Sequence, residues 1–190
     1  LHLTTGSSNQ VAGPAPGASI STGLVTPGDS DLDYLSDLLG NGSLSNDACI
    51  VELDVFVATN ELNFEYIFGS EEYTEFVGGQ FNDIFAFLIS GDGITGDPNI
   101  DNQLNIATLP GTNTPVEINS VNNSINWQYY RNNEDGQSVA YDGLTSDFLG
   151  VKKRLTATAS VAPCQTYHLK LAVADRGDGI LDSGVFIGEL

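Results

Sequence analysis

Two turns of the chain gather most of the side chains that are able to do chemistry. The first turn lies between two apolar runs and carries four oxygen donors, namely Glu71, Glu72, Asn82 and Asp83. Oxygen ligands from one loop suit Ca²⁺, which binds about 6–8 of them. The alternative is a short solvated helix that Ser70 caps, although two adjacent glutamates beside a buried strand would then repel each other. We therefore expect a cation at this turn.

The second turn carries Asp175, Asp178 and Asp182 among three glycines. Their spacing does not match the calcium loop of an EF-hand, which needs alternating acidic residues, a glycine and a late glutamate. Aspartate and glycine are also ordinary turn formers, and Arg176 is close enough in sequence to neutralise one carboxylate. The density of carboxylates nevertheless favours a cation contact here too.

A third acidic segment begins at Asp29 and includes Asp31. It starts like an EF-hand loop, but Tyr34 occupies the position that needs glycine. The segment also resembles the start of a lipase-type Gly-Asp-Ser-Leu block superficially, yet Asp31 replaces the leucine and neither histidine has the spacing of the catalytic base. Helix capping by Ser30 is the preferred interpretation, and a cation contact by Asp29 or Asp31 is the alternative.

Composition limits the classes of function. The 190 residues include 25 acidic and 6 basic side chains, which give a formal net charge of −19. This charge disfavours nucleic acid and anionic membranes, whose binding needs clustered Lys and Arg, and no stretch reaches the ~18–20 apolar residues of a membrane span. Glu71 with Asp83 or Asp175 would be a possible glycosidase pair. Because Trp127 and Tyr129 are expected in the core rather than in a sugar cleft, we do not expect an enzyme.

Apolar and polar side chains alternate in several runs, and this period of two predicts β-strands. Residues 84–89 are apolar throughout and indicate a central strand, whereas Asn60 fits a hairpin turn between two alternating runs. Leucines on one face predict a helix over 30–39. The other expected strands cover 20–25, 51–57, 62–68, 104–108, 115–121, 125–130, 138–141, 155–161, 166–174 and 184–188. The pattern predicts one mainly β domain over 1–190, a β-sandwich or jelly-roll-like fold with one or two short helices and a loop-rich entry at 1–19.

The two cysteines leave two interpretations open. Cys49 and Cys164 each border a strand-like run and lack metal-type spacing, so they form either a disulfide or two buried thiols. A bridge would close a loop of over a hundred residues, which the chain-entropy description values at roughly 4–5 kcal/mol. An oxidising compartment would favour the bridge.

An ordered set of sequence blocks resembles the choice-of-anchor L domain of bacterial surface proteins. Its core is Phe64-Glu65-Tyr66-Ile67-Phe68-Gly69-Ser70-Glu71-Glu72-Tyr73, followed by Phe81-Asn82-Asp83-Ile84-Phe85. Further blocks cover 28–32, 105–110, 141–145, 167–175 and 182–186. The resemblance extends over about 24–188, and the ordered set is much more specific than any single block.

Some proteins of this resemblance group are peptide-binding domains near the tips of very long, calcium-dependent bacterial adhesins. The resemblance implies that Ca²⁺ holds the carboxylate of a peptide or protein C-terminus, with Ser70, Tyr73, Phe76 and Ser183 beside the ligand. A chain at −19 needs such an ion, because it would otherwise repel an anionic peptide end. We expect a monomeric extracellular module of a larger adhesin on a bacterial cell surface. A calcium-dependent carbohydrate-binding module and a spacer stiffened by Ca²⁺ are the alternatives.

Overall fold

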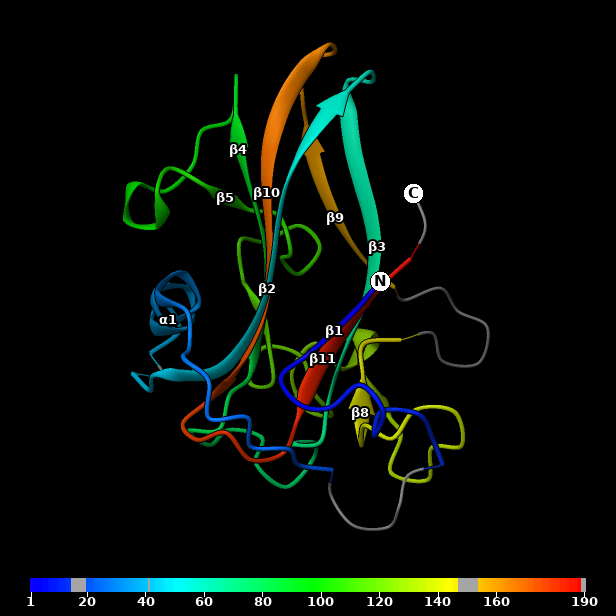
Figure 1. Cartoon of the computed structure of the whole chain (residues 1–190). Helices are drawn as coiled ribbons and strands as arrows, with labels where there is room; N and C mark the ends of the chain where they lie inside the picture. Colours follow the sequence, from blue (N-terminus) through cyan, green and yellow to red (C-terminus); the bar gives the residue numbers. More distant parts are fainter. Residues whose placement is uncertain (15–19, 41, 147–153, 189–190) are drawn as a thin grey trace.

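Two antiparallel β-sheets stack face to face in the computed structural model, which describes residues 1–14, 20–40, 42–146 and 154–188 (Figure 1). The first sheet contains, in spatial order, β1 (His2–Thr4), β11 (Ser183–Ile187), β3 (Glu61–Ser70), β8 (Gly143–Leu144) and β7 (Arg131–Asn132), and β9 (Leu155–Ser160) also pairs with β3. The second contains β2 (Ser45–Val57), β10 (Gln165–Arg176), β4 (Ile84–Gly91) and β5 (Leu104–Asn105), and β6 (Val116–Glu117) also pairs with β4. The prediction of a mainly β sandwich is confirmed.

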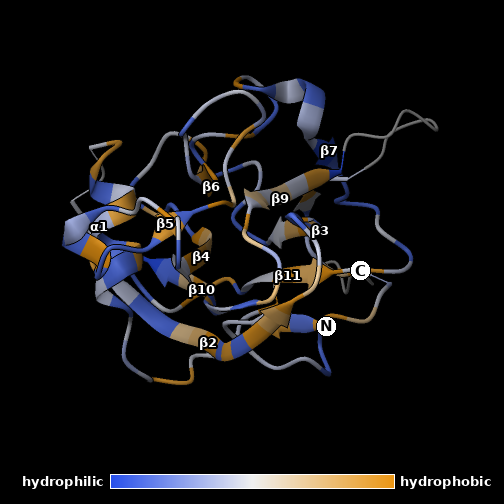
Figure 2. Ribbon diagram, turned by 90° about the horizontal axis from the view of Figure 1, so that it is seen from above, coloured by the Kyte–Doolittle hydropathy of each residue, from blue (hydrophilic) through white to orange (hydrophobic). Residues whose placement is uncertain are grey.

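The position of β4 follows from its sequence, because it is apolar on both faces. Phe85 and Phe87 pack in the core between the two sheets, whereas Ile84 and Leu88 pack beneath helix α1 (Ser30–Asp37). The leucines of α1 turn toward this outer face of the second sheet, and Figure 2 shows the helix lying against it. The expected central strand is therefore confirmed, with a helix rather than solvent on its second face.

The predicted hairpin at Asn60 is wrong. β2 belongs to the second sheet and β3 to the first, so the turn between them carries the chain from one sheet to the other. The connection from β9 to β10 crosses beside it, where the Val161 N–H donates to the Asn60 carbonyl (3.0 Å) and the Cys164 N–H donates to the Val57 carbonyl (2.6 Å). Two sheet-crossing turns thus lie together at one end of the sandwich (Figure 1).

Several short predicted strands are mostly loop. The runs 104–108 and 115–121 contribute two strand residues each, 138–141 contributes an isolated bridge, and 20–25 and 125–130 contain no strand. Single-turn 3-10 helices form at η1 (Pro98–Ile100) and η2 (Trp127–Tyr129). We expected Trp127 and Tyr129 in the core. Trp127 is instead 63% exposed, whereas Tyr129 is half-buried and packs against the core. Alternating polarity in a run this short did not distinguish a strand from a loop.

The disulfide interpretation of the cysteines is wrong, since both are free. The alternative of two buried thiols is wrong as well, because Cys49 is half-buried and Cys164 is exposed. In the pairing of β2 with β10, Cys49 faces Val173, whereas Cys164 immediately precedes Gln165, which faces Val57. The eight residues from Cys49 to Val57 span about 26 Å of extended strand. A disulfide requires Cα atoms within about 7 Å of each other, so the two thiols lie too far apart.

Candidate functional site

Four strand ends meet at the end of the sandwich away from the sheet-crossing turns. β3 ends at Ser70, which pairs with the first residue of β11, Ser183. β4 begins at Ile84, which pairs with Ala174 near the end of β10. The carboxyl groups that these ends bring within electrostatic reach of one another, here called the carboxylate cluster, are Glu71, Glu72, Asp83, Asp175 and Asp182. The two turns singled out in the sequence therefore form one site.

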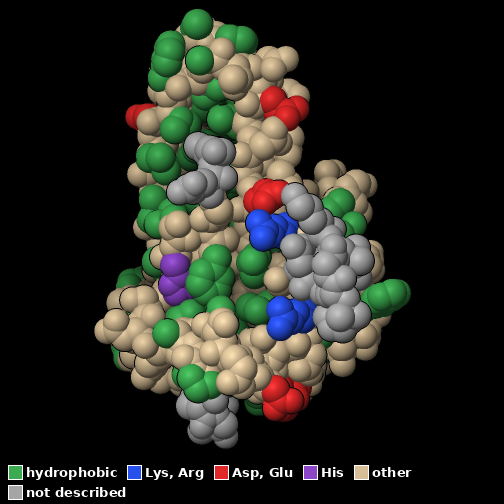
Figure 3. Space-filling model, turned by 90° about the vertical axis from the view of Figure 1, so that its right-hand side faces the viewer, with side chains coloured by type: hydrophobic (Ala, Val, Ile, Leu, Met, Phe, Trp, Pro, Cys, Tyr) green, Lys and Arg blue, Asp and Glu red, His purple; other side chains and the backbone are tan. Residues whose placement is uncertain are grey.

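The carboxylate cluster is inside the protein. Each of its five side chains is no more than 3% exposed. On the face of the molecule seen in Figure 3, the visible Asp and Glu side chains are few and separate and form no continuous acidic surface. Burying a carboxylate is unfavourable unless hydrogen bonds or opposite charges compensate for the lost hydration. The partners of each carboxylate therefore decide what the cluster can do.

Asp83 is the one member with both oxygens hydrogen-bonded. Its Oδ1 accepts the backbone N–H of Arg176 (2.8 Å), and its Oδ2 accepts the hydroxyl of Ser183 (2.6 Å). The backbone N–H of Ser183 in turn donates a hydrogen bond to the hydroxyl oxygen of Thr5 (2.9 Å). Asp83 thus ties the second sheet to the first, and Ser183 serves this connection rather than an open ligand surface.

Each of the other four carboxylates has at least one oxygen without a hydrogen-bond partner in the described chain. The backbone N–H of Ile20 donates to Glu71 Oε2 (3.0 Å), and that of Thr22 donates to Asp182 Oδ1 (2.8 Å). Within the described residues, the buried carboxylate oxygens without a hydrogen-bond partner are Glu71 Oε1, Glu72 Oε2, Asp175 Oδ1, Asp175 Oδ2 and Asp182 Oδ2. Unpaired buried oxygens of this kind are rare in folded proteins and require an explanation.

Arg176 does not neutralise the cluster with its side chain. Its guanidinium instead contacts Asp33 (2.6 Å) and Asp37 (3.1 Å) on α1, and only its backbone N–H reaches Asp83. The guanidinium is fully buried between β10 and the helix. Its charge is therefore used to hold α1 on the second sheet, and the cluster keeps its own negative charge or its protons.

Burial shifts the acidity of the cluster strongly. Removal from water raises the pKa of Glu71 to about 8, of Glu72 to about 9 and of Asp83 to about 7. It raises the pKa of Asp175 to about 10 and that of Asp182 above its ordinary value, and repulsion between neighbouring carboxylates acts in the same direction. At neutral pH the cluster must hold protons or a cation.

The cluster fits a hard cation in donor type but not as a preassembled coordination shell. All five groups supply oxygen, the ligand atom that Ca²⁺ prefers, and four have an oxygen with no other partner in the described part of the chain. Across the described ranges, however, no three His, Cys, Asp or Glu side chains stand in an arrangement ready to hold a metal ion. Binding would require the side chains to turn toward a common point.

The remaining predicted ligands have other partners. Asp29, not Ser30, is the N-cap of α1, because its Oδ1 accepts the backbone N–H groups of Asp31 and Leu32. Asp29 and Asp31 also bind the ammonium group of Lys170 at 2.6 and 2.7 Å. Asp178 accepts the N–H of Ile180 within its own turn at 3.0 Å. The structure thus favours capping and ion pairing for the acidic segment that begins at Asp29.

The predicted ligand contacts are mostly internal. Tyr73 is fully buried, donates its hydroxyl hydrogen to the Val121 carbonyl (2.6 Å) and packs on Tyr130, so the structure assigns it to the core. Ser70 is buried as well, and its hydroxyl oxygen accepts the N–H of Glu72 (2.9 Å). Phe76 is 38% exposed near the tip of the loop. Of the expected contacts it is the side chain that solvent reaches.

The sequence analysis did not predict two further buried acids, Asp47 and Glu117. Asp47 accepts the N–H groups of Leu24 (3.0 Å) and Thr26 (2.6 Å), so it anchors the segment that crosses the cluster. Glu117 accepts the Ser36 hydroxyl (3.0 Å), and burial raises its pKa to about 7. An ionisable residue between two apolar ones, as Glu117 is, was the available signal for a buried acid.

The described residues form a β-sandwich with an internal acidic cluster at one end. The chain belongs to the choice-of-anchor L domain family, which matches residues 1–189. This is a family of surface-associated modules and not a family of known enzymes. None of the curated proteins and none of the solved structures compared with the chain matches it. Among the described residues, no helix has the length and apolar character to cross a bilayer.

Proposed function

We propose that this chain is a non-catalytic adhesin module on a bacterial cell surface, and that its carboxylate cluster binds Ca²⁺. The bound ion holds the terminal carboxylate of a peptide or protein from another cell. One observation supports this proposal above the others, namely five buried carboxylate oxygens without a hydrogen-bond partner in the described chain. A divalent cation supplies the charge and the ligand bonds that these oxygens lack.

Electrostatics explains why the ion is needed for recognition. The chain carries a net charge of −19, and the only cation near the cluster in sequence, Arg176, is directed to α1. An anionic peptide end would therefore meet repulsion at this end of the sandwich. A Ca²⁺ ion that keeps one coordination position open reverses the local sign and accepts the peptide carboxylate.

In this proposal a ligand reaches the buried cluster beside the loop between β3 and β4. Its first residues are buried in the cluster, whereas residues 78–80 at the tip are exposed together with Phe76. Phe76 stands edge-on to Phe81 with the ring centres 5.5 Å apart, which presents an apolar surface next to the cluster. This surface would select the last side chains of the ligand.

The test is a calorimetric titration of metal-free protein with Ca²⁺, followed by titration with a library of short peptides in free-acid and amidated forms. Amidation removes the negative charge and should weaken binding by at least ~2 kcal/mol, roughly thirtyfold. Chelation of Ca²⁺ should abolish binding of the free acid.

Two variants control for general damage. Asp175→Asn should lose Ca²⁺ affinity, and Asp92→Asn, an exposed acid in the turn after β4, should keep it. The carboxylate mechanism is refuted if acid and amide bind equally well or if peptide binding survives chelation. The calcium site itself is refuted if no heat of Ca²⁺ binding appears for folded, metal-free protein.

A further inference from the structure

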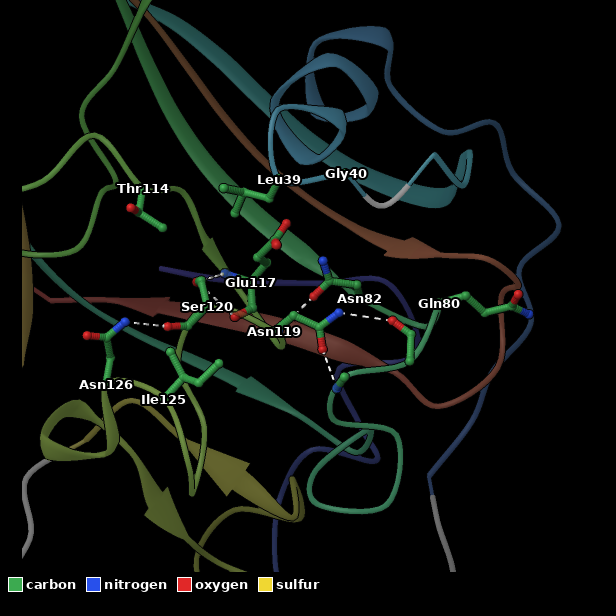
Figure 4. A pocket seen from close by; sticks show the side chains of 12 residues that line it. Leu39, Gly40, Gln80, Asn82, Thr114, Glu117, Asn119, Ser120, Ile125 and Asn126 are labelled. Carbon is green, nitrogen blue, oxygen red and sulfur yellow. Dashed lines mark hydrogen bonds between the residues drawn. The ribbon is translucent and has the colours of Figure 1, made fainter.

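A polar pocket of about 580 Å³ lies beside the loop between β3 and β4 (Figure 4). Asn82, one of the predicted cation ligands, lines this pocket, and its Oδ1 accepts the backbone N–H of Asn119 (2.7 Å). The side chain of Asn119 in turn donates to the carbonyl of Gly79 (2.9 Å). These groups bond to one another across the pocket and thereby hold the loop in place.

β2 is the longest described strand, and it has a neighbouring strand on one side only (Figures 1 and 2). β10 pairs with it along almost its whole length. On the other side the segment 26–27 covers only the beginning, where its carbonyls accept the N–H groups of Asp47 and Ala48 at 3.1 Å each. From Cys49 to Phe56 no described segment hydrogen-bonds to that side. This part of the strand, here called the open edge, therefore presents unpaired backbone N–H and C=O groups.

The open edge carries exposed apolar side chains on both faces of the sheet. On the outer face Ile50 is 40% exposed and Phe56 is 69% exposed. On the inner face Leu53 is also 40% exposed, although Leu169, its partner in β10, is buried in the core. In the described strands, the one other large apolar side chain with such exposure is Leu104 of β5. A long edge that combines apolar side chains with unpaired backbone groups is a template for an added strand.

The outer face of the open edge is negatively charged. Glu52 and Asp54 lie there at alternate positions, with side chains that are 53% and 69% exposed. They share one histidine of β10, because His168 Nδ1 is 2.9 Å from Asp54 Oδ1 and its Nε2 is 3.7 Å from Glu52 Oε2. Lys170, which faces Glu52 in the ladder, directs its ammonium group to the acidic segment 29–31 instead. One imidazole can balance at most one of the two carboxylates, so a strand beside β2 meets negative charge on this face.

This charge disfavours a second copy of the chain as the added strand. An antiparallel pair of two β2 strands that uses the whole open edge is centred on Leu53, and it places Glu52 of each copy opposite Asp54 of the other. Like charges directly opposite each other destabilise a strand pair, and each copy also carries a net charge of −19. A strand with Lys or Arg at these positions would instead gain from the same two acids.

We propose that the open edge of β2 binds an extended segment of another protein as an added strand. The side chains of that segment alternate between apolar residues, which cover Leu53 and its inner-face neighbours, and Lys or Arg, which lie over Glu52 and Asp54. Main-chain hydrogen bonds supply the affinity of such a complex, and the alternate side chains supply its specificity. The open edge runs toward the sheet-crossing turns and away from the carboxylate cluster, so this inference is independent of the calcium-binding proposal.

The test uses metal-free protein in chelator and synthetic peptides of about nine residues that alternate Val or Phe with Lys, together with counterparts that carry Glu in place of Lys. We expect at least one basic peptide to bind with a Kd on the order of 100 μM, and its acidic counterpart to bind at least about tenfold more weakly. Hydrogen exchange should show new protection at alternate amides of residues 49–56. Methylation of alternate peptide nitrogens should abolish binding in one phase, where the donors face β2, and not in the other.

Charge reversal locates the binding. Glu52→Lys combined with Asp54→Lys changes two exposed side chains, so the fold should persist and the preference should shift to the acidic peptide. The matched control combines Glu134→Lys with Asp135→Lys, two exposed acids after β7, and should leave the affinity unchanged. The proposal is overturned if no basic peptide binds, if both methylated forms bind equally, or if charge reversal at 52 and 54 has no effect. Protection of the same amides without peptide, together with a doubled mass in sedimentation, would assign the open edge to a second copy instead.

Discussion

Asp175 offers the sharpest test of the carboxylate cluster, because it is buried and neither of its oxygens has a hydrogen-bond partner in the described chain. In the unfolded chain at pH 8 this carboxyl is ionised, whereas burial raises its pKa in the folded protein to about 10. Folding at pH 8 must therefore protonate the group or bury its charge. We predict that Asp175→Asn, which removes the charge and keeps the size of the side chain, stabilises the metal-free protein.

The magnitude follows from the acidity shift. Protonating this carboxyl on folding costs about 1.4 kcal/mol for each pH unit above its ordinary pKa. At pH 8 the largest gain in stability from removing the carboxyl is therefore about 6 kcal/mol. Relaxation and water entry reduce that limit, and we expect a gain of about 2–3 kcal/mol. The sign follows from linkage. A carboxyl whose pKa is raised by folding contributes its full stability at a pH below its unfolded pKa, which is near 4 for Asp175. This contribution is lost as the pH rises toward the folded pKa. At pH 4 the variant and the wild type should therefore be about equally stable.

Urea unfolding in chelator at pH 4 and pH 8 measures both values, with Asp92→Asn as the exposed control that should change neither. In saturating Ca²⁺ the order should reverse at pH 8, because the wild type gains binding energy that the variant has lost. A variant that is no more stable than the wild type at pH 8 in chelator would refute the conclusion that the cluster contains an uncompensated carboxylate.

Three further predictions concern the metal, the helix and the thiols. Ca²⁺ at one hundred times its Kd should raise the free energy of unfolding by about 2.7 kcal/mol, which raises the Tm of a chain of this length by about 5–10 °C. A melting curve that does not change after verified removal of the metal would contradict a calcium site. Lys170→Met should cost about 3 kcal/mol, because it leaves the buried Asp29 and Asp31 without their cation. Arg154→Met removes an exposed ion pair with Glu65 and should cost under ~1 kcal/mol; equal losses in urea unfolding would show that burial of the first pair is unimportant. Both thiols should react with an alkylating agent in native, oxidised protein, Cys164 faster than the half-buried Cys49, and a mass two hydrogens below that of the reduced chain would show a bridge instead.

The sequence determined the class of fold and much of the composition of the site. Period-two alternation predicted the long strands, because a strand with one face on a core must alternate. The acidic residues of the two turns indicate a cation site, and the structure brings five of them, Glu71, Glu72, Asp83, Asp175 and Asp182, together at neighbouring strand ends. The other predicted ligands, Asp29, Asp31, Asn82 and Asp178, have partners elsewhere. The resemblance in ordered blocks also gave the family to which the chain belongs.

Tertiary structure decided which strands pair and which side chains are buried. A turn at Asn60 looks the same in sequence whether its strands share a sheet or cross between two sheets, since both strands alternate in either case. The same long-range pairing separates Cys49 from Cys164 and turns Tyr73 into a core residue. The acidity of the cluster depends on segments far away in the chain, such as Ile20 and Thr22, that cover it. Burial is a property of everything that packs over a residue, and neighbouring residues in the sequence do not encode it.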